Sequence, residues 1–360
     1  MNILYITYTN LENVDSGSGV RPARMYQAFL DEGHSVKLLS GNCGRKDGAA
    51  RKKAVGEIMD WLKDHRPDLC YIESPTYPIM FQCDYALIRK LHQMKVPIGY
   101  FYRDFYRKFP ELFPRRKGFV NSLKETYLDY LQFKTDRILR LVNVVYVPSE
   151  SCCDLFRYKN MKVLPPAGVD RLPEHKERNY TIIYVGGMVG HYDGPKLLDA
   201  VAELYRRDQR YRLILVCRQA EWEKMCHLCK DAPWLEVHHA SGEELAPLYS
   251  RAAAAVVIGK QENTYNTLAI SVKIFEYMSF GLPMVAFDNG ESGKLLRKEG
   301  IGIPVEASAT AMADALEGLL NDEQSYNQYQ VNIQDGLRNR HLWSHRVKQI
   351  IHDLCPLNHA

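Results

Sequence analysis

The stretch SVKIFEYMSFGLPMVAFDNG, from Ser271 to Gly290, joins a short helical pattern directly to an apolar strand. Lys273 and Glu276 lie three residues apart in the helical part, so their side chains are neighbours on the helix surface. Gly281 and Pro283 then turn the chain sharply into the strand. A helix that leads into a short buried strand is the building unit of α/β proteins, and two charges beside such a strand indicate a candidate site.

The same alternation of strand and helix runs through the whole chain. Short apolar runs indicate buried strands, and segments with helical spacing separate them. The predicted strands have the sequences NILYITY, SVKLLS, DLCYIE, VPIGYFY and VNVVYVPS in the first half, and YTIIYVGG, YRLILVC, LEVHH, AAAAVVI and LPMVAF in the second. Helices are predicted over Val20–Asp31, Ala50–His65, Tyr85–Met94, Val120–Arg140, Pro195–Arg207 and Ala220–Lys230, and from Asp322 onward. This order favours parallel sheets built from βαβ units.

The alternation pauses at VLPPAGVD, Val163 to Asp170, where a double proline and a glycine suit a linker. Two successive α/β segments of similar size predict two Rossmann-like doubly wound domains that face each other across a cleft. We expect an N-terminal domain over residues 1–168, a C-terminal domain over 169–340, and a helix over 341–360 that returns to the N-terminal domain. Ligands of such sheets bind beyond the carboxyl ends of the strands, so site residues are expected in the loops there.

The composition is that of an ordinary globular protein. Of the 360 residues, 46% are hydrophobic and 25% are charged, and the net charge of +4 is too weak to imply nucleic-acid binding by itself. No long apolar run indicates a membrane span, and the first ten residues carry no basic leader. Nine scattered cysteines favour reduced thiols and a cytoplasmic location. The only CxxC pair, Cys226 and Cys229, is a weak zinc signal, and buried thiols are the alternative.

The start of the helix near Ile270 and Ser271 is a predicted anion site. The first amides of a helix have no acceptor within the helix, and the helix dipole is positive at this end. Glu276 lies about one and a half turns further on, and an ionised carboxylate can accept two hydrogen bonds at once. The alternative for Glu276 is a solvated carboxylate that pairs with Lys273.

Several segments resemble the GT-B-fold, family 4 retaining glycosyltransferases (glycosyl transferases group 1). The quoted stretch is similar to their C-terminal signature, GSGVRPARMYQAFLDEGHSVKLLS to their glycine loop and first helix, IIYVGGM to the opening of their C-terminal domain, and SGEELAPLYSRAAAAVV to the stretch before the sugar-nucleotide site. The resemblance covers nearly the whole chain and implies transfer of a sugar from a nucleotide-sugar donor with retention. It further implies that Glu276 holds the ribose hydroxyls of the donor. Lys273 could lean toward the donor phosphates, and a structural ion pair is the alternative.

The reaction that the resemblance implies needs no metal. Transfer breaks the bond between the anomeric carbon and the donor phosphate, and helix amides or cations near that phosphate stabilise the charge that grows on it. No convincing DxD-type motif is present, so neither a metal nor another cofactor is expected. The expected donor is a UDP- or GDP-linked sugar. The expected acceptor is a glycan or a lipid-linked glycan, in polysaccharide or cell-surface glycan biosynthesis.

The carboxylates depart from the family pattern. The family usually carries two glutamates eight positions apart, and the position eight before Glu276 is Leu268. Glu262, fourteen positions before Glu276, does not have the spacing to replace it. The backbone amides from Asn266 to Ile270 would then hold the donor hexose instead.

The cations depart from the pattern as well. The family usually has an arginine after the YVG strand and a lysine several residues later, and the corresponding positions here are Gly187 and Asp193. Gly187 stays a donor-binding candidate because of its place after the strand. Arg218, at the end of YRLILVC, and Lys196 could replace the missing cations, although a solvated helix face is the stronger interpretation for Lys196.

The N-terminal half contributes candidates near the reacting sugar. The family often places a histidine after the fourth strand, where this chain has Arg103 and Asp104 in YFYRDFY. Arg103 could contact the donor phosphate or the acceptor, and Asp104 could take the proton of the acceptor hydroxyl; an Arg–Asp surface pair is the alternative. Gly17 and Gly19, in the loop after the first strand, suit close approach of the backbone to the donor, although an ordinary tight turn has the same pattern. Glu73, at the end of DLCYIE, also faces the predicted cleft.

The segment from Arg103 to Lys124 combines basic and aromatic residues. This composition suits an anionic membrane surface, where each basic side chain contributes about 1 kcal/mol. A solvated loop whose aromatic residues pack on the domain is the alternative, and no nucleic-acid motif accompanies the patch. We therefore expect a cytoplasmic protein that is peripheral to the inner face of the membrane. The basic residues are Arg103, Arg107, Lys108, Arg115, Arg116, Lys117 and Lys124, against Asp104 and Glu111, and the aromatic residues are Phe105, Tyr106, Phe109, Phe113 and Phe119.

Two other functions stay open. With Leu268, Gly187 and Asp193 at family positions, the chain could be a degenerate GT-B protein that serves as a partner or scaffold. A GT-B sugar-nucleotide epimerase is the second alternative. An NAD-dependent oxidoreductase is poorly supported, because the GSG loop lacks the third glycine of the dinucleotide fingerprint and no acidic residue ends SVKLLS.

Overall fold

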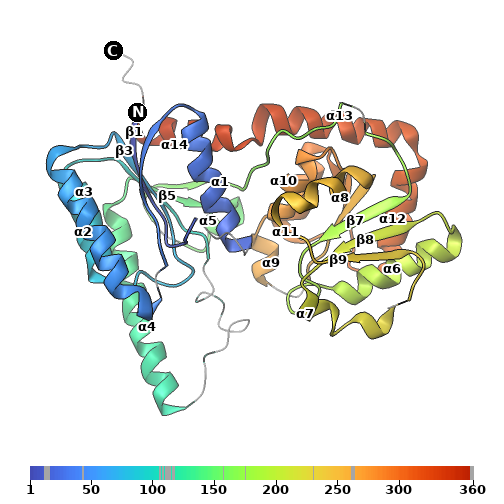
Figure 1. Ribbon diagram of the computed structural model, residues 1–360, viewed down its shortest axis with the longest axis horizontal. Coiled ribbons are helices and arrows are strands. Elements are labelled where there is room, and N and C mark those ends of the chain that lie inside the picture. The colour runs from blue at the N-terminus through green and yellow to red at the C-terminus, as the bar shows by residue number, and fades with distance from the viewer. Residues whose placement is uncertain are drawn as a thin grey trace. The chain divides into compact units, whose positions relative to one another are not determined.

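The computed structural model describes residues 1–11, 17–42, 44–104, 107, 109, 115, 118–156, 158–174, 176–229, 231–260 and 264–356. The chain forms two compact units (Figure 1): Met1–Pro165 with Trp343–Ala360, called the N-terminal unit below, and Pro166–Leu342, called the C-terminal unit. Each unit is built on a six-stranded parallel sheet with helices. This confirms the α/β fold with two Rossmann-like domains, whereas the cleft between the domains stays a prediction.

The sheet of the N-terminal unit has the strand order β2-β1-β3-β4-β5-β6. The order reverses beside β1, so the switch point of this sheet lies between β1 and β3. The strands β3, β4 and β5 are buried along their whole length, as expected for parallel strands that are covered on both faces. The strands are β1 (Asn2–Ile6), β2 (Ser35–Leu39), β3 (Leu69–Glu73), β4 (Ile98–Phe101), β5 (Val144–Val147) and the unpredicted β6 (Met161–Val163).

The four helices predicted for the first half of the chain are confirmed, with shifted ends. The C-terminal helix α14 also belongs to this unit, where it contacts α1 and β4. The helices are α1 (Gly17–Asp31), α2 (Gly48–Asp64), α3 (Gln82–Gln93), α4 (Phe119–Ile138), α5 (Glu150–Cys153) and α14 (Trp343–Leu354), with short 3-10 helices at Arg45–Asp47 and Leu139–Leu141.

The sheet of the C-terminal unit has the strand order β12-β11-β10-β7-β8-β9. Its switch point lies between β7 and β10, which are neighbours in the sheet but not in the sequence. The strands are β7 (Thr181–Val185), β8 (Arg212–Val216), β9 (Leu235–His238), β10 (Ala254–Val257), β11 (Met284–Phe287) and the unpredicted β12 (Gly302–Val305).

Helices cover both faces of this second sheet. Tyr184 of β7 packs in one core with α6 and α12, and the next residue back, Ile183, packs in the other core with α10 and α13. The helices are α6 (Gly194–Arg207), α7 (Gln219–Trp222), α8 (Ala246–Arg251), α9 (Thr264–Leu268), α10 (Val272–Ser279), α11 (Gly290–Glu299), α12 (Ala309–Asn321) and α13 (Glu323–Arg340), with 3-10 helices at Cys226–Leu228 and Gly242–Leu245. Within the described ranges, every helix is too short or too polar to cross a bilayer.

The helix predicted over Ala220–Lys230 is wrong. Its apolar residues do reach the core, but the chain gets there through tight turns in which an amide bonds the carbonyl three residues back, as Met225 does to Trp222. A spacing of three and four residues is compatible with both arrangements, so the pattern alone does not separate them. The helical run predicted from Asp322 onward is likewise interrupted, at His341 and Leu342.

Candidate functional site

The switch point of the C-terminal unit brings three predicted segments together. The strand β7 ends at Val185 and leads into Gly186 and Gly187, and β8 ends two residues before Arg218. The helix α10 begins after Ser271, which confirms the predicted helix start. Because α10 connects β10 to β11, its first turn lies at the edge of the sheet where the parallel strands end.

Lys273 points from α10 toward the end of β7. Its Nζ donates a hydrogen bond to the Tyr184 hydroxyl at 3.1 Å and lies 4.3 Å from the centre of the Tyr192 ring. Burial lowers the pKa of the Lys273 ammonium to about 8, and Glu276 and Glu221 oppose this shift. No carboxylate among the described residues forms an ion pair with Lys273. The side chain is thus a half-buried cation that is held by aromatic rings and that none of the described carboxylates pairs with.

Two glycines leave the space that the Lys273 side chain and the Tyr192 ring occupy. Gly186 has a φ of 146°, and a Cβ on it would lie 2.1 Å from the Lys273 Nζ. A Cβ on Gly187 would lie 2.4 Å from the Tyr192 ring, while the Gly187 carbonyl accepts a hydrogen bond from the Tyr184 hydroxyl. Any larger side chain at Gly187 would therefore collide with Tyr192.

Arg218 lies at the carboxyl end of β8, as predicted, but its side chain is 76% exposed. It forms an ion pair with Glu221 at 3.6 Å, and Glu221 accepts a hydrogen bond from the Met188 amide at 2.7 Å. Glu221 therefore holds the loop after β7 in place. The other replacement cation, Lys196, pairs with Asp193 at 2.7 Å on the first turn of α6.

Glu276 is half-buried on α10, and the Tyr249 hydroxyl donates a hydrogen bond to its Oε2 at 3.4 Å. Tyr249 stacks on Phe280 with ring centres 4.6 Å apart. Burial, and then the charge of Glu276, raises the pKa of Tyr249 well above its usual range, so the hydroxyl stays a neutral donor. The carboxylate is thereby oriented by a rigid aromatic neighbour, and the alternative of a solvated Glu276 beside Lys273 is not what the structure shows.

The amides at the start of α10 are only partly free. The Ser271 amide donates to the Ser292 hydroxyl at 3.2 Å, so the sequence-based expectation that this amide is open is wrong. The amides of Val272 and Lys273 follow, and none of the described residues accepts a hydrogen bond from them. The first turn thus offers two donors beside the Lys273 ammonium.

The segment before α10 contains the short helix α9. Asn266 lies on α9, and its side-chain amide donates to the carbonyls of His191 and Lys260 at 3.0 and 3.2 Å. The Ala269 amide donates to the Tyr265 carbonyl at 3.1 Å. The prediction that the backbone amides from Asn266 to Ile270 are all available is therefore wrong at Ala269, because α9 ends in this bond. Glu262 lies outside the described residues.

The switch point of the N-terminal unit carries a different arrangement. Arg21 of α1 forms a buried ion pair with Glu73 at 3.1 Å, and the Tyr71 hydroxyl also donates to Glu73 at 2.8 Å. The guanidinium lies 3.5 Å from the centre of the Phe101 ring and 5.7 Å from that of Trp343. Glu73 was predicted to face a cleft and is instead fully buried, because Arg21 supplies a counter-charge inside the unit.

The two glycines of the predicted first loop are part of a helix. Gly17 is the first residue of α1 and Gly19 is its third, so their placement in a loop is wrong. The sequence rules treat glycine as a helix breaker, but that cost applies to helix interiors rather than to the first turn. The residues between, Glu12 to Ser16, lie outside the described part of the chain.

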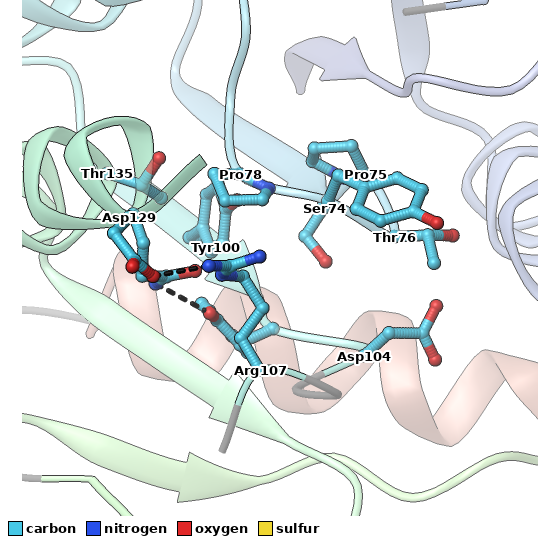
Figure 2. Close-up of a pocket in the computed structure, with 12 residues that line it drawn as sticks. Ser74, Pro75, Thr76, Pro78, Tyr100, Asp104, Arg107, Asp129 and Thr135 are labelled. Carbon is cyan, nitrogen blue, oxygen red and sulfur yellow. Dashed lines mark hydrogen bonds and ion pairs between the residues drawn. The ribbon is translucent and has the colours of Figure 1, made fainter. Parts of the chain in front are cut away.

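A pocket lies beyond β3 and β4 in the N-terminal unit (Figure 2). The Arg103 guanidinium donates to Asp104 at 3.0 Å and to the Thr76 hydroxyl at 2.9 Å, and its amide donates to the Ser74 hydroxyl at 3.0 Å. Both charged side chains are mostly buried, so the pair is a partly enclosed one rather than a solvated surface pair. The pocket is lined by Ser74, Pro75, Thr76, Tyr77, Pro78, Tyr100, Tyr102, Asp104, Arg107, Asp129, Gln132 and Thr135.

Besides Arg103, two further basic residues of the predicted membrane segment are paired with carboxylates. Arg107 binds Glu125 and Asp129 of α4, and Arg115 also pairs with Asp129. These cations therefore face carboxylates within the unit, which a count of basic residues does not reveal. Much of the segment lies outside the described residues, namely Phe105, Tyr106, Lys108, Glu111, Phe113, Arg116 and Lys117.

Cys226 and Cys229 lie on and beside a 3-10 helix. Burial raises the pKa of Cys229 to about 11, so this thiol stays protonated at neutral pH. In the part of the chain that the structure describes, no three His, Cys, Asp or Glu side chains are grouped so that they could hold a metal ion.

Sequence reasoning missed the residues that orient the predicted ones. These are Tyr184 and Tyr192 around Lys273, Glu221 behind the loop after β7, and Tyr249 beside Glu276. Tyr184 lies two residues before Gly186 in YVGG, so its alternation within the strand was a usable signal. The other three come from separate segments, and no local pattern connects them to the site.

Comparisons with known proteins agree with this architecture. Residues 179–322, which lie in the C-terminal unit, match the family model described as glycosyl transferases group 1. None of the curated proteins matches the chain by sequence.

Three solved structures illustrate the similarity. A sucrose-phosphate synthase from Thermosynechococcus elongatus has a TM-score of 0.66 at 14% identity, with 97% of each chain covered. WaaG, a glycosyltransferase involved in lipopolysaccharide biosynthesis, has a TM-score of 0.64 at 14% identity, covering 98% of this chain and 100% of its own. HepE from Anabaena, in complex with UDP, has a TM-score of 0.67 at 14% identity, covering 98% and 99%. The chain thus shares the two-domain fold of glycosyltransferases, and its segment 179–322 matches group 1 of these enzymes.

Proposed function

We propose that the protein is a retaining glycosyltransferase of family 4 that moves a sugar from a UDP- or GDP-linked donor to a glycan or a lipid-linked glycan. The observation that carries this proposal is Lys273, a half-buried cation at the switch point of the C-terminal unit that pairs with no carboxylate in the described part of the chain. A nucleotide diphosphate supplies the missing negative charge. Similarity to HepE, which was solved with UDP and with UDP-glucose, supports a donor of this class.

The proposed donor site uses four groups of α10. The amides of Val272 and Lys273 and the Lys273 ammonium bind the diphosphate, and the Glu276 carboxylate accepts hydrogen bonds from the ribose hydroxyls. The loop of Gly186 and Gly187 lets the diphosphate approach Lys273 closely, because no side chain projects there. Arg218 and Asn266 line the rim, where Arg218 keeps its charge exposed.

The chemistry follows from where charge develops. When the bond between the anomeric carbon and the donor oxygen breaks, negative charge grows on the departing phosphate and the sugar becomes oxocarbenium-like. Amides and an ammonium fixed beside that phosphate stabilise this state more than the ground state. Because Lys273 supplies the positive charge, the proposed reaction needs no metal and no other cofactor.

The N-terminal unit supplies the acceptor side of the proposed reaction. Asp104 accepts the proton of the attacking hydroxyl, and Arg103, which donates to both Asp104 and Thr76, fixes its orientation. The hydroxyls of Ser74 and Thr76 suit a sugar acceptor that exchanges hydrogen bonds with the pocket (Figure 2). The enzyme would act in polysaccharide or cell-surface glycan biosynthesis, in the cytoplasm at the inner face of the membrane.

Donor turnover tests the proposal. The purified protein is incubated with a panel of UDP- and GDP-linked sugars and with lipid extracts or oligosaccharides as acceptors, and the released nucleotide is followed by mass spectrometry. We expect release for one donor, with the same rate in the presence of EDTA and an unchanged anomeric configuration in the product by NMR. Absence of nucleotide release with every donor, together with absence of nucleotide binding in calorimetry, would contradict it.

The departures from the family pattern favour one alternative, a degenerate GT-B protein that serves as a partner or scaffold. Leu268, Gly187 and Asp193 replace three family residues, and this alternative predicts no nucleotide binding. A sugar-nucleotide epimerase would instead change the donor sugar when no acceptor is present.

A further inference from the structure

The helix α4 has an exposed apolar face that the described residues of its own unit do not cover. Only Leu131, Thr135 and Ile138 are buried on this helix, all in its C-terminal half, and the N-terminal half projects from the unit (Figure 1). Phe119, the most exposed of the large apolar residues, keeps 81% of its accessible surface. The apolar face, called the α4 stripe below, consists of the exposed residues Phe119, Val120, Leu123, Tyr127, Tyr130 and Phe133.

The spacing puts all six side chains on one side of the helix. At 3.6 residues per turn, they fall within about 140° of the helix circumference. Four of the six are aromatic, and the hydroxyls of Tyr127 and Tyr130 suit the boundary between an apolar phase and water. A continuous stripe of this kind on an otherwise polar surface marks an interaction site.

Three cations of α4 lie on or beside the α4 stripe. Lys124 flanks the stripe, and Lys134 and Arg137 continue it toward the C-terminal end, with the Lys134 ammonium 5.5 Å from the centre of the Tyr130 ring. Burial, and then the nearby charge of Arg89 on α3, lowers the pKa of Lys134, so a fourth cation lies close to this end.

The acidic residues of α4 lie on the other side of the helix. Glu125 and Asp129 bind Arg107, and Asp136 accepts hydrogen bonds from Gln132 and Tyr158. Arg107 and Arg115 thus compensate Glu125 and Asp129 within the unit, and the cations Lys124, Lys134 and Arg137 lie on or beside the apolar side. A partner for this face must be apolar and negatively charged at its surface.

We propose that the α4 stripe docks the protein on an anionic lipid bilayer, with α4 in the plane of the headgroups. The stripe would enter the boundary between headgroups and acyl chains, while Lys124, Lys134 and Arg137 contact lipid phosphates. This inference deepens the peripheral location proposed above and rests on it. The proposed membrane surface is thus the exposed face of α4 rather than the basic residues of the segment from Arg103 to Lys124, three of which are paired with carboxylates.

A second copy of the chain fits the charges less well. In a parallel pair of stripes, Lys134 would face Lys134, and in an antiparallel pair centred on Asp129 it would face Lys124. Like charges in contact oppose both arrangements. A bilayer that contains phosphatidylglycerol instead supplies a negative charge for each cation.

Vesicle flotation tests the proposal without donor or acceptor, so its outcome is independent of sugar transfer. The full-length protein is mixed with vesicles of phosphatidylcholine and phosphatidylglycerol, or of phosphatidylcholine alone. We expect binding to the mixed vesicles that falls as salt is added, and much weaker binding to the neutral ones. The variant Phe119→Gln, Leu123→Gln, Tyr130→Gln should lose about tenfold or more of the partitioning, because glutamine keeps the helix but removes apolar area.

Matched controls separate docking from general surface change. The variant Leu228→Gln, Val331→Gln alters two exposed apolar residues of the C-terminal unit and should bind like the wild type. Thermal unfolding of each variant checks that the fold is intact. The proposal is overturned if the wild type does not bind the mixed vesicles, or if the triple variant binds them as well as the wild type. It is also overturned if light scattering shows that the wild type is a dimer and the triple variant is a monomer.

Discussion

Each sheet has a cation at its switch point, but the two cations differ in their partners. In the N-terminal unit, Arg21 is buried and paired with Glu73 beneath Phe101 and Trp343. In the C-terminal unit, Lys273 is half-buried, is held by tyrosines, and has no carboxylate paired with it among the described residues. One charge is neutralised within the fold and the other is left for a ligand. The comparison supports the proposal that the sheet of the C-terminal unit binds the anionic part of the donor.

The difference predicts where each cation acts. A buried ion pair that loses one partner leaves an uncompensated charge, so Arg21 contributes to stability. A cation held without a counter-anion costs desolvation energy in the free protein and regains it when an anion binds, so Lys273 contributes to affinity. Four changes would break or sharpen this contrast.

Removal of Arg21 should have the largest effect. Arg21→Met leaves the Glu73 carboxylate buried without its counter-charge, and we expect the free energy of unfolding to fall by about 3–5 kcal/mol, as measured by urea denaturation. The double variant Arg21→Met, Glu73→Leu removes both charges and should recover most of the loss. If the single variant is as stable as the wild type, the pair does not hold the switch point of the N-terminal unit.

The carboxylate of the donor site should have the next largest effect. Glu276→Gln keeps the size of the side chain but removes the charge that accepts the ribose hydroxyls, so we expect the affinity for UDP or GDP to fall about tenfold. Glu291→Gln, on the neighbouring helix α11, is the matched control, since Glu291 pairs with Lys294. Equal losses in both variants would mean that Glu276 does not contact the nucleotide.

The sequence predicted the fold more fully than it predicted the site. Nearly all strands and the start of α10 followed from apolar runs and from one turn signal, Gly281 with Pro283, because these features are local. The edge strands β6 and β12 were missed because they are short and half-exposed, so they carry little apolar signal.

At the site, the sequence located Lys273 and Glu276 but not their neighbours. The choice between a helix-surface ion pair and a cation directed at β7 depends on Tyr184 and Tyr192, which are distant in sequence. In the same way, the sequence predicted that Glu73 faces a cleft, whereas its ion pair with Arg21 buries it inside the unit. Local patterns predict which helix or strand carries a charged residue. The side chain that pairs with this residue, and so decides its role, depends on tertiary packing.

The pH dependence of binding is a smaller effect. Because burial lowers the pKa of Lys273 to about 8, the ammonium is lost as the pH rises through this value, and the affinity for UDP should fall from pH 7.5 to 9. The unfolded chain keeps its proton up to a pKa of about 10.4, so stability should instead rise with pH between these two values. Calorimetry across this range checks both, and an affinity that is independent of pH would exclude Lys273 from the site.

The smallest expected effect is that of Lys273 on stability. Lys273→Met removes a half-buried cation without leaving a buried carboxylate unpaired, so we expect urea denaturation to show a change of less than about 1 kcal/mol, or a gain. Lys298→Met, an exposed position on α11, is the control. A loss as large as that of Arg21→Met would remove the contrast between the two switch points.

The most direct measurement compares UDP with uridine on the wild type and on Lys273→Met by isothermal titration calorimetry. If Lys273 binds the diphosphate, the variant should lose about tenfold or more of its affinity for UDP and keep its affinity for uridine, which has no phosphate. Equal losses of affinity for both ligands, or no loss of affinity for UDP, would contradict the proposal that the Lys273 ammonium binds the donor diphosphate.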